Sequence, residues 1–278
     1  MKLSIITINF NDVSGLEKTI QSVINQTYKD FEYIVIDGAS TDGSVEVIKK
    51  YSDKLTHWVS EPDTGIYNAM NKGTSMASGE YCLFLNSGDF LAADDVLEKV
   101  FCYNFSEDIV SCGLILFNDK EEWLQLPPKN ISLYTFVNGS LPHPSTFIKK
   151  ILLNELGGYN ETFRIVSDWC FFLDAFIMKQ CSYKTYDFVL SKFNCFGVSS
   201  TSGKKRDEEM KRYLSMKFPY VMDDYIPYED EAIYNVLQWT QSHSTLKSFI
   251  VFPFKVLNRI LKLRNRLSRR VRIYSLSK

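Results

Sequence analysis

The stretch Tyr81–Asp89 decides the fold. It reads YCLFLNSGD, an apolar run of strand length that changes abruptly into small polar residues and ends in a carboxylate. In an open α/β sheet, ligands bind outside the carboxyl ends of the strands, so Asn86, Ser87 and Asp89 are well placed to meet a polar ligand. Asp89 is also a hard oxygen ligand of the kind that Mg²⁺ or Mn²⁺ prefers. Taken alone, the stretch favours an ordinary strand-to-helix turn in which Asp89 caps the next helix.

Strand and helix patterns alternate before this stretch. Apolar, β-branched runs predict strands at 3–10, 31–36 and 57–59, and the helical spacing of apolar residues predicts a helix after each of them. Polar residues gather where these strands end: Asn9, Asn11, Asp37, Glu61 and Asp63. The pattern predicts an α/β fold with a mostly parallel central sheet flanked by helices, and a ligand crevice along the strand ends.

The alternation weakens in the second half of the chain. There the sequence predicts strands at 109–117, 143–148 and 186–196, a hairpin partner strand at 122–126, and helices at 167–178 and 207–218. The six cysteines are scattered and none forms a C-x-x-C pair, which argues against a zinc site or a redox motif.

Charge is distributed unevenly along the 278 residues, whose net charge is −1. The segment 246–278 contains 10 Lys and Arg and no Asp or Glu. Apolar residues recur in it at helical spacing, which indicates a basic amphipathic helix at a membrane surface. Alternatively, this basic helix packs on the acidic body of the protein, or the segment is a disordered tail. No window reaches about 18 consecutive apolar residues, so we expect no transmembrane helix.

Several familiar motifs are missing. The chain has no G-x-G-x-x-G after the first strand, no G-x-x-x-x-G-K-[ST] loop and no G-x-S-x-G elbow. Their absence speaks against a dinucleotide-binding fold, a phosphate-loop ATPase and an α/β-hydrolase. What remains is a carboxylate-rich crevice, which suits a diphosphate chelated by a metal ion.

Linked motifs then resemble glycosyltransferase family 2, an inverting family with the GT-A fold. They are Ser4–Thr7, the helix ending at Gln26, Val35–Ser44, Ser60–Tyr67 and Phe84–Asp89, in the family's order. The resemblance covers roughly residues 1–195. It implies one GT-A domain over 1–220, with a nucleotide-binding half at 1–91 and an acceptor-facing half at 92–220, followed by a helical extension with a basic amphipathic tail at 221–278.

The resemblance also implies roles for individual residues. Asp168, at the start of a predicted helix, matches the catalytic base, and Asp89 matches the carboxylate that holds Mn²⁺ or Mg²⁺. Asn86 stands where the family's Asp-x-Asp region often has its first carboxylate, so Asp89 alone must supply the metal carboxylate. The nucleotide-binding residues implied are Thr7, Asn9, Asn11, Asp37, Asp63, Asn86 and Ser87, with Asp37 reading the nucleobase, usually uracil. The sugar and acceptor residues are Glu61, Tyr67, His143 and Trp169.

Each assignment has an ordinary structural alternative. Asp168 also suits a helix N-cap, the residues around Asp63 suit a turn, and a single buried histidine such as His143 is often structural. The resemblance nevertheless implies transfer of a sugar from a nucleotide sugar, of UDP type, to a glycan or lipid-linked glycan in surface polysaccharide assembly. The scattered cysteines and the basic tail suit a cytoplasmic enzyme that is peripheral on the inner face of the membrane. The acidic body and the lack of a base-reading motif speak against a nucleic-acid partner. A sugar-nucleotide-binding module without turnover and a nucleotidyltransferase remain as alternatives.

Overall fold

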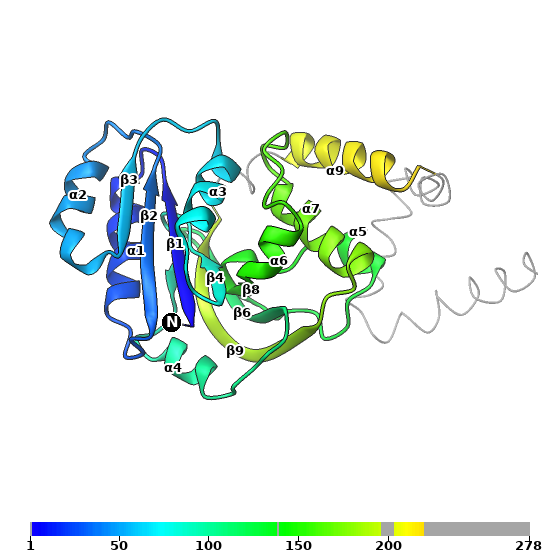
Figure 1. Cartoon of the computed structure of the whole chain (residues 1–278), viewed down its shortest axis with the longest axis horizontal. Coiled ribbons are helices and arrows are strands. Elements are labelled where there is room, and N and C mark those ends of the chain that lie inside the picture. Colours follow the sequence, from blue (N-terminus) through cyan, green and yellow to red (C-terminus); the bar gives the residue numbers. More distant parts are fainter. Residues whose placement is uncertain (1, 138, 196–202, 220–278) are drawn as a thin grey trace, which may run out of the picture. The chain divides into compact units, whose positions relative to one another are not determined.

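The computed structural model describes residues 2–137, 139–195 and 203–219. The predicted basic tail at 246–278 lies outside the described residues. By its contacts the chain divides into Met1–Tyr213 and Leu214–Lys278. The first unit contains nearly all of the described chain and is built on a nine-stranded sheet in the order β3-β2-β1-β4-β8-β6-β9-β5, with β7 paired to β6 (Figure 1).

The first half of the sheet is parallel, as the alternating pattern predicts. Its strands are β1 (Leu3–Asn9), β2 (Phe31–Asp37), β3 (His57–Ser60) and β4 (Tyr81–Phe84). The pairing sets Asn9 opposite Asp37 and Asp37 opposite Ser60. Three polar residues therefore lie side by side at the ends of three neighbouring strands.

Helices cover both faces of these parallel strands (Figure 1). On one face, α1 (Val13–Ile24) and α2 (Ser44–Lys50) pack their apolar residues on Leu3, Ile5 and their neighbours. On the other face lies α3 (Ile66–Met76), whose Gly73 sits so close to the sheet that an added Cβ would lie 2.4 Å from the Ile6 side chain. A glycine is needed there because any larger residue would push α3 off the sheet.

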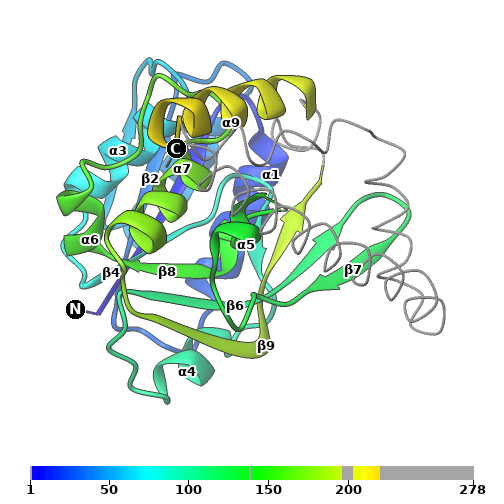
Figure 2. The same ribbon diagram turned by 90° about the vertical axis from the view of Figure 1, so that its right-hand side faces the viewer.

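The second half of the sheet mixes directions. It contains β5 (Phe90–Leu91), β6 (Ile109–Phe117), β7 (Glu122–Gln125), β8 (Thr146–Lys149) and β9 (Tyr183–Asn194). Strands β6 and β7 form the predicted antiparallel hairpin, while β6 and β9 are parallel with a register irregularity around Gly113. The sheet curves through β9 (Figure 2).

Helices of the second half are mostly short. They are α4 (Val96–Phe101), α5 (Leu133–Val137), α6 (Lys150–Glu155), α7 (Ser167–Leu173) and α9 (Gly203–Lys217). The helix predicted at 167–178 is α-helical only to Leu173 and continues as a π-helical turn, Asp174–Met178. Among the described residues, no helix has the length and apolarity needed to cross a membrane.

Candidate active site

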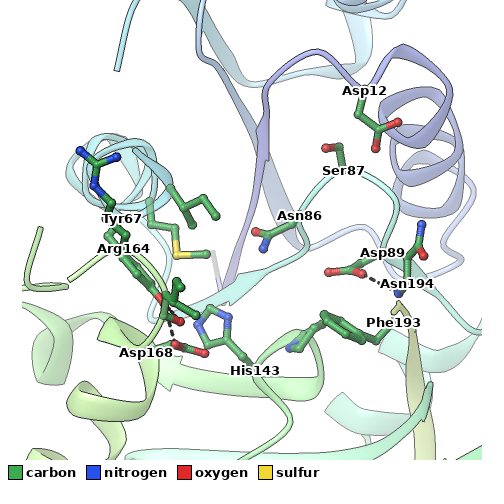
Figure 3. Close-up of a pocket in the computed structure, with 14 residues that line it drawn as sticks. Asp12, Tyr67, Asn86, Ser87, Asp89, His143, Arg164, Asp168, Phe193 and Asn194 are labelled. Atoms are coloured by element: carbon green, nitrogen blue, oxygen red, sulfur yellow. Dashed lines mark hydrogen bonds between the residues drawn. The ribbon is translucent and has the colours of Figure 1, made fainter. Parts of the chain in front are cut away.

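One cavity of about 320 Å³ opens where the two halves of the sheet meet (Figure 3). One part of its wall comes from the ends of β1 and β4 and the start of α1, and the other from α3, the 143–144 turn and the N-terminus of α7. Six of the predicted site residues line it: Tyr67, Asn86, Ser87, Asp89, His143 and Asp168. The chain thus brings together groups that are up to 101 positions apart in sequence.

Asp168 lies in the first turn of α7. The hydroxyl of Tyr67 lies 2.7 Å from its Oδ1 and also 2.7 Å from the carbonyl oxygen of Ile165. Burial, reinforced by the charge of Asp168, raises the pKa of Tyr67 well above its ordinary value, so the phenol keeps its proton and acts as a donor. The side chain of Asp168 makes no N-cap hydrogen bond to its own helix, whose N-cap residue is Val166. The carboxylate is therefore fixed by another element and faces the cavity.

His143 lies beside Asp168 in the cavity wall (Figure 3). Its Nε2 is 2.8 Å from the hydroxyl of Tyr159, and its ring stacks on Phe84 with centroids 5.3 Å apart. Burial lowers the pKa of His143, although the charge of Asp168 opposes this shift. The imidazole is therefore neutral at physiological pH, and its packing fixes it as part of the wall between the two carboxylates.

Asp89 forms the opposite part of the site. Its Oδ1 accepts a hydrogen bond of 3.0 Å from the backbone N–H of Asn194, at the end of β9. Burial raises the pKa of Asp89 to about 8, since the two backbone hydrogen bonds do not offset the loss of solvation. Asn86 places its Oδ1 in the same wall, buried and without a hydrogen-bond partner among the described residues.

These oxygens suit a divalent metal. Magnesium and manganese sites in phosphoryl-substrate enzymes use one or two carboxylates and complete their shell with phosphate oxygens and water. Asp89 and the unpartnered Asn86 oxygen fit that chemistry, and Asp12 of the same wall adds a second carboxylate. Within 2–137, 139–195 and 203–219, no group of three or more His, Cys, Asp or Glu side chains comes together to hold an ion by itself. A bound substrate would have to complete the shell.

The other predicted nucleotide residues form a separate polar cluster at the ends of β1, β2 and β3. Asp37 is fully buried and accepts hydrogen bonds from Asn9 (2.7 Å), the hydroxyl of Ser40 (2.6 Å) and Ser60 (2.6 Å). Burial alone would raise the pKa of Asp37, but these hydrogen bonds outweigh it and the pKa lies below its ordinary value. Asp37 is therefore an ionised acceptor held in one orientation.

Two loops flank this cluster. Asn11 has a φ of 50° and its Oδ1 accepts from the Thr41 N–H at 2.9 Å. Asp63 accepts from the Gly65 N–H at 2.9 Å and its other oxygen lies over Gly38, 2.6 Å from where a Cβ would stand. The turn predicted around Asp63 is thus present.

Three predicted residues belong neither to the cavity wall nor to the cluster around Asp37, each for a physical reason. Thr7 is fully buried within β1, where its hydroxyl is 3.0 Å from that of Tyr33. Trp169 points to the interior and its Nε1 donates to the Phe136 carbonyl at 2.9 Å. Glu61 is exposed and forms an ion pair of 2.7 Å with Lys72. The side chains of Thr7, Trp169 and Glu61 are therefore engaged elsewhere.

Eight residues of the cavity wall were not among the predicted site residues, and four of them have polar or aromatic side chains: Asp12, Arg164, Phe193 and Asn194. The polar end of β1 points to Asp12, which stands just ahead of α1. For Arg164, just ahead of Asp168, the sequence leaves open a phosphate contact or a pairing with Glu161. Phe193 and Asn194 end β9, and Asn194 lies 105 positions from Asp89. Nothing local in the sequence connects these two, because strand pairing carries the end of β9 to Asp89: β9 pairs antiparallel with β5, which directly follows Asp89, and parallel with β6.

This sheet, with its mixed second half and a carboxylate at each side of one cavity, defines a GT-A type glycosyltransferase. A family model described as "Glycosyl transferase family 2" matches residues 4–177, and the chain belongs to that family. The chain is 36% identical over 203 residues to an uncharacterized glycosyltransferase of Mycobacterium tuberculosis, which covers 71% of this chain and 77% of the relative. The predicted family, fold and enzyme class are confirmed.

Solved structures show the same fold at low sequence identity. TarS of S. aureus in complex with UDP superposes with a TM-score of 0.62 at 19% identity, covering 78% of this chain and 65% of that chain. The mannosyltransferase PcManGT from Pyrobaculum calidifontis, in complex with GDP-Man and Mn²⁺, gives 0.59 at 17%, covering 77% and 63%. This chain therefore spans slightly less than two thirds of each solved chain.

Proposed function

We propose that this glycosyltransferase moves one sugar from a UDP-sugar to a hydroxyl of a glycan or lipid-linked glycan, with inversion at the anomeric carbon. The observation that carries the proposal is that one cavity has Asp168 on one side and Asp89, Asn86 and Ser87 on the other (Figure 3). A donor whose diphosphate lies at Asp89 would present its sugar toward Asp168. That separation of a base from a phosphate-binding group is what a single displacement needs.

Asp168 is the proposed base. It removes the proton of the acceptor hydroxyl as that oxygen bonds to the anomeric carbon, while the bond from that carbon to the diphosphate oxygen breaks and its electron pair leaves with the diphosphate. Tyr67 holds the carboxylate in place through the 2.7 Å hydrogen bond to Oδ1. Positioned general bases typically contribute about 10²–10⁴-fold to rate.

Asp89, Asn86 and Asp12 are the residues proposed to hold Mn²⁺ or Mg²⁺ together with the donor diphosphate. A bound divalent cation supplies charge stabilisation for the departing diphosphate. The polar cluster around Asp37 is proposed to bind the uracil, because an ionised, pre-oriented carboxylate suits the N–H of that base. The Mn²⁺ and the nucleotides named for the two solved structures support this class of donor.

A second cavity of about 170 Å³ adjoins the first and shares Ile66, Tyr67 and Arg164 with it. Its wall combines an aromatic ring, Phe163, with polar groups such as Glu161, a combination that suits a sugar ring. We place the acceptor there, next to Asp168. The basic segment 246–278 is proposed to hold the enzyme at the inner membrane surface, near a lipid-linked acceptor.

Calorimetric titration of UDP, with and without Mn²⁺, tests the donor side of the proposal. UDP binding that Mn²⁺ strengthens in the wild type and in Asp95→Ala, but not in Asp89→Ala, is the expected result. Asp95 is a matched control because it is a surface carboxylate paired with Lys99 on α4. Absence of UDP binding under both conditions would contradict the uridine assignment of Asp37.

Measurements of turnover test whether Asp168 is the catalytic base. Asp168→Asn should lower kcat by about 10²–10⁴-fold and leave the UDP affinity unchanged, since the amide keeps the shape but accepts no proton. The stereochemistry of the product, read by NMR at the new anomeric centre, tests inversion. A product that retains the donor configuration would contradict a single displacement.

A further inference from the structure

Helix α9 holds the segment that leads into α7. The carboxylate of Glu209 accepts from the backbone N–H of Arg164 through Oε1 at 3.0 Å and from that of Ile165 through Oε2 at 3.0 Å. Two successive amides ahead of a short helix thus share one side-chain carboxylate. Such charge-assisted bonds to backbone N–H groups are stronger than neutral ones.

Two further residues of α9 contact the same segment. Arg212 donates from Nη2 to the carbonyl oxygen of Thr162 at 3.2 Å and lies over the Phe163 ring, 4.4 Å from its centroid. Tyr213 packs edge-on against Phe163, with centroids 5.6 Å apart, and against Trp169 of α7 at 5.9 Å. Positions i, i+3 and i+4 of a helix share one face, so Glu209, Arg212 and Tyr213 form a single contact surface.

Most contacts between α9 and this segment are polar. Tyr213 is the one residue of the described helix that is buried, so apolar packing fixes the helix at one point only. A surface helix without a broad apolar face needs specific contacts to stay in register. Glu209 supplies the most specific of these contacts, because its two oxygens address two adjacent amides.

The segment 162–165, which α9 contacts, carries two groups of the active site. Arg164 lines both cavities, and the carbonyl oxygen of Ile165 accepts from the same Tyr67 hydroxyl that holds Asp168. Figures 1 and 2 show α9 alongside α7 in both views. We propose that Glu209 is a positioning residue: it fixes the Arg164–Ile165 backbone from outside the cavity and thereby sets the positions of Asp168 and Arg164 for transfer.

This inference rests on the proposed function, since it gives Glu209 a purpose in sugar transfer. A displacement of about 1 Å at a reacting group is enough to lower a rate by around 10²-fold. Glu209 itself lines neither cavity, so its loss should affect turnover without touching the donor.

Three variants test the inference: Glu209→Ala, Glu209→Gln and Glu208→Ala. Glu208 is the control because it is the neighbouring, exposed glutamate of the same helix. In Glu209→Ala, kcat should fall by about 10–100-fold, while the KM for the donor and the Kd for UDP stay within about twofold. Glu209→Gln should recover part of kcat because its one amide oxygen still accepts from one of the two backbone N–H groups, and Glu208→Ala should match the wild type.

Hydrogen exchange supplies a readout that does not depend on turnover. The amides of Arg164 and Ile165 should exchange faster in Glu209→Ala, with no change in β1 or β2. Equal kcat in Glu209→Ala and Glu208→Ala, or a loss of kcat matched by an equal loss of UDP affinity, would overturn the positioning role. Failure of the wild type to transfer from any nucleotide sugar would overturn the proposed function as well, which separates the two cases.

Discussion

The hydroxyl of Tyr67 in α3 lies 2.7 Å from Oδ1 of Asp168 in α7, and this contact ties the two helices together in one wall of the cavity. Tyr67 is only 5% exposed, so water does not compete effectively for its proton. The same hydroxyl is within 2.7 Å of the Ile165 carbonyl oxygen, which fixes the phenol ring relative to the start of α7. Tyr67 therefore orients the carboxylate that we propose as the base.

Tyr67→Phe tests this relationship because it removes one oxygen and keeps the ring. A hydrogen bond to a charged group is worth about 1.5–3 kcal/mol, so we expect kcat to fall by roughly 10–100-fold while the donor KM changes little. Tyr183→Phe is the matched control, since it also loses a hydroxyl bonded to a carbonyl oxygen, that of Pro128, outside the cavity. Unchanged kcat in Tyr67→Phe would show that Asp168 needs no orientation from Tyr67.

The buried carboxyl of Asp89 predicts an unusual dependence of stability on pH. Burial raises the pKa of Asp89 to about 8 in the folded chain, above the ordinary value of 3.8. The folded state therefore binds the extra proton more tightly than the unfolded state, and this contribution to stability is fully present below pH 3.8 and lost as the pH rises through about 8. Asn at this position does not titrate and can still accept from the Asn194 N–H.

Asp89→Asn should accordingly gain thermal stability relative to the metal-free wild type as the pH rises from 5 to 8, by at most about 1.4 kcal/mol per pH unit. Thermal unfolding in chelator, followed across this range, measures the difference. Mn²⁺ with UDP should stabilise the wild type and not the variant. A constant stability difference from pH 5 to pH 8 would show that Asp89 is ionised throughout.

Local pattern was enough to predict the first half of the fold and its polar strand ends. Asn86, Ser87 and Asp89 follow directly from a strand that breaks into small polar residues, and the structure places all three in the cavity wall. Contacts between residues far apart in the sequence cannot be predicted from local patterns. Asn194 reaches Asp89 because β9 pairs with β5 and with β6, and the polar end of β1 does not indicate that the Thr7 hydroxyl faces inward to Tyr33.

The packing position of α9 likewise could not be predicted from local sequence patterns. The sequence predicts a helix near 207–218, and the structure has it at Gly203–Lys217. Its apolar residues, however, do not mark a partner, because the helix is held chiefly through Glu209 and Arg212. Polar contacts to backbone amides leave no periodic signal in a sequence, so the location of such a helix follows only from the structure.

Gly88 is expected to be irreplaceable for donor binding. Its φ is +91°, and an added Cβ would lie 3.3 Å from the Asn194 side chain and 3.5 Å from Asp12 Oδ2. Gly88→Ala should lose about 1–2 kcal/mol of stability from the left-handed backbone, and it should also weaken the Mn²⁺-dependent binding of UDP by crowding the cavity wall.

Gly157→Ala separates these two effects. Gly157 has a φ of +78° with open space around the position of a Cβ, so its substitution incurs the backbone strain alone. Urea unfolding and UDP calorimetry on both variants should show similar losses of stability but a loss of UDP affinity only in Gly88→Ala. Equal UDP affinities would place Gly88 outside the donor site.

Glu32 predicts a stability effect far from the cavity. This glutamate is 2% exposed, and one of its oxygens accepts from the Ser4 hydroxyl at 2.6 Å and from the Gly79 N–H at 3.0 Å. Burial alone would raise the pKa of Glu32, but its hydrogen bonds from Ser4, Ser78 and Gly79 outweigh it and the pKa lies below the ordinary 4.5. The charged form therefore stabilises the turn between α3 and β4.

Glu32→Gln should cost about 1–3 kcal/mol at pH 7, because an amide N–H₂ would then face donors that need an acceptor. The exposed Glu46 of α2 gives the matched control, Glu46→Gln, for which we expect no change. Since the folded pKa of Glu32 is depressed, its contribution is present above pH 4.5 and lost as the pH falls below that value, so the difference between wild type and Glu32→Gln should shrink in acid. Urea unfolding at pH 7 and pH 3.5 measures both, and an equal difference at the two pH values would mean that the charge of Glu32 does not stabilise the fold.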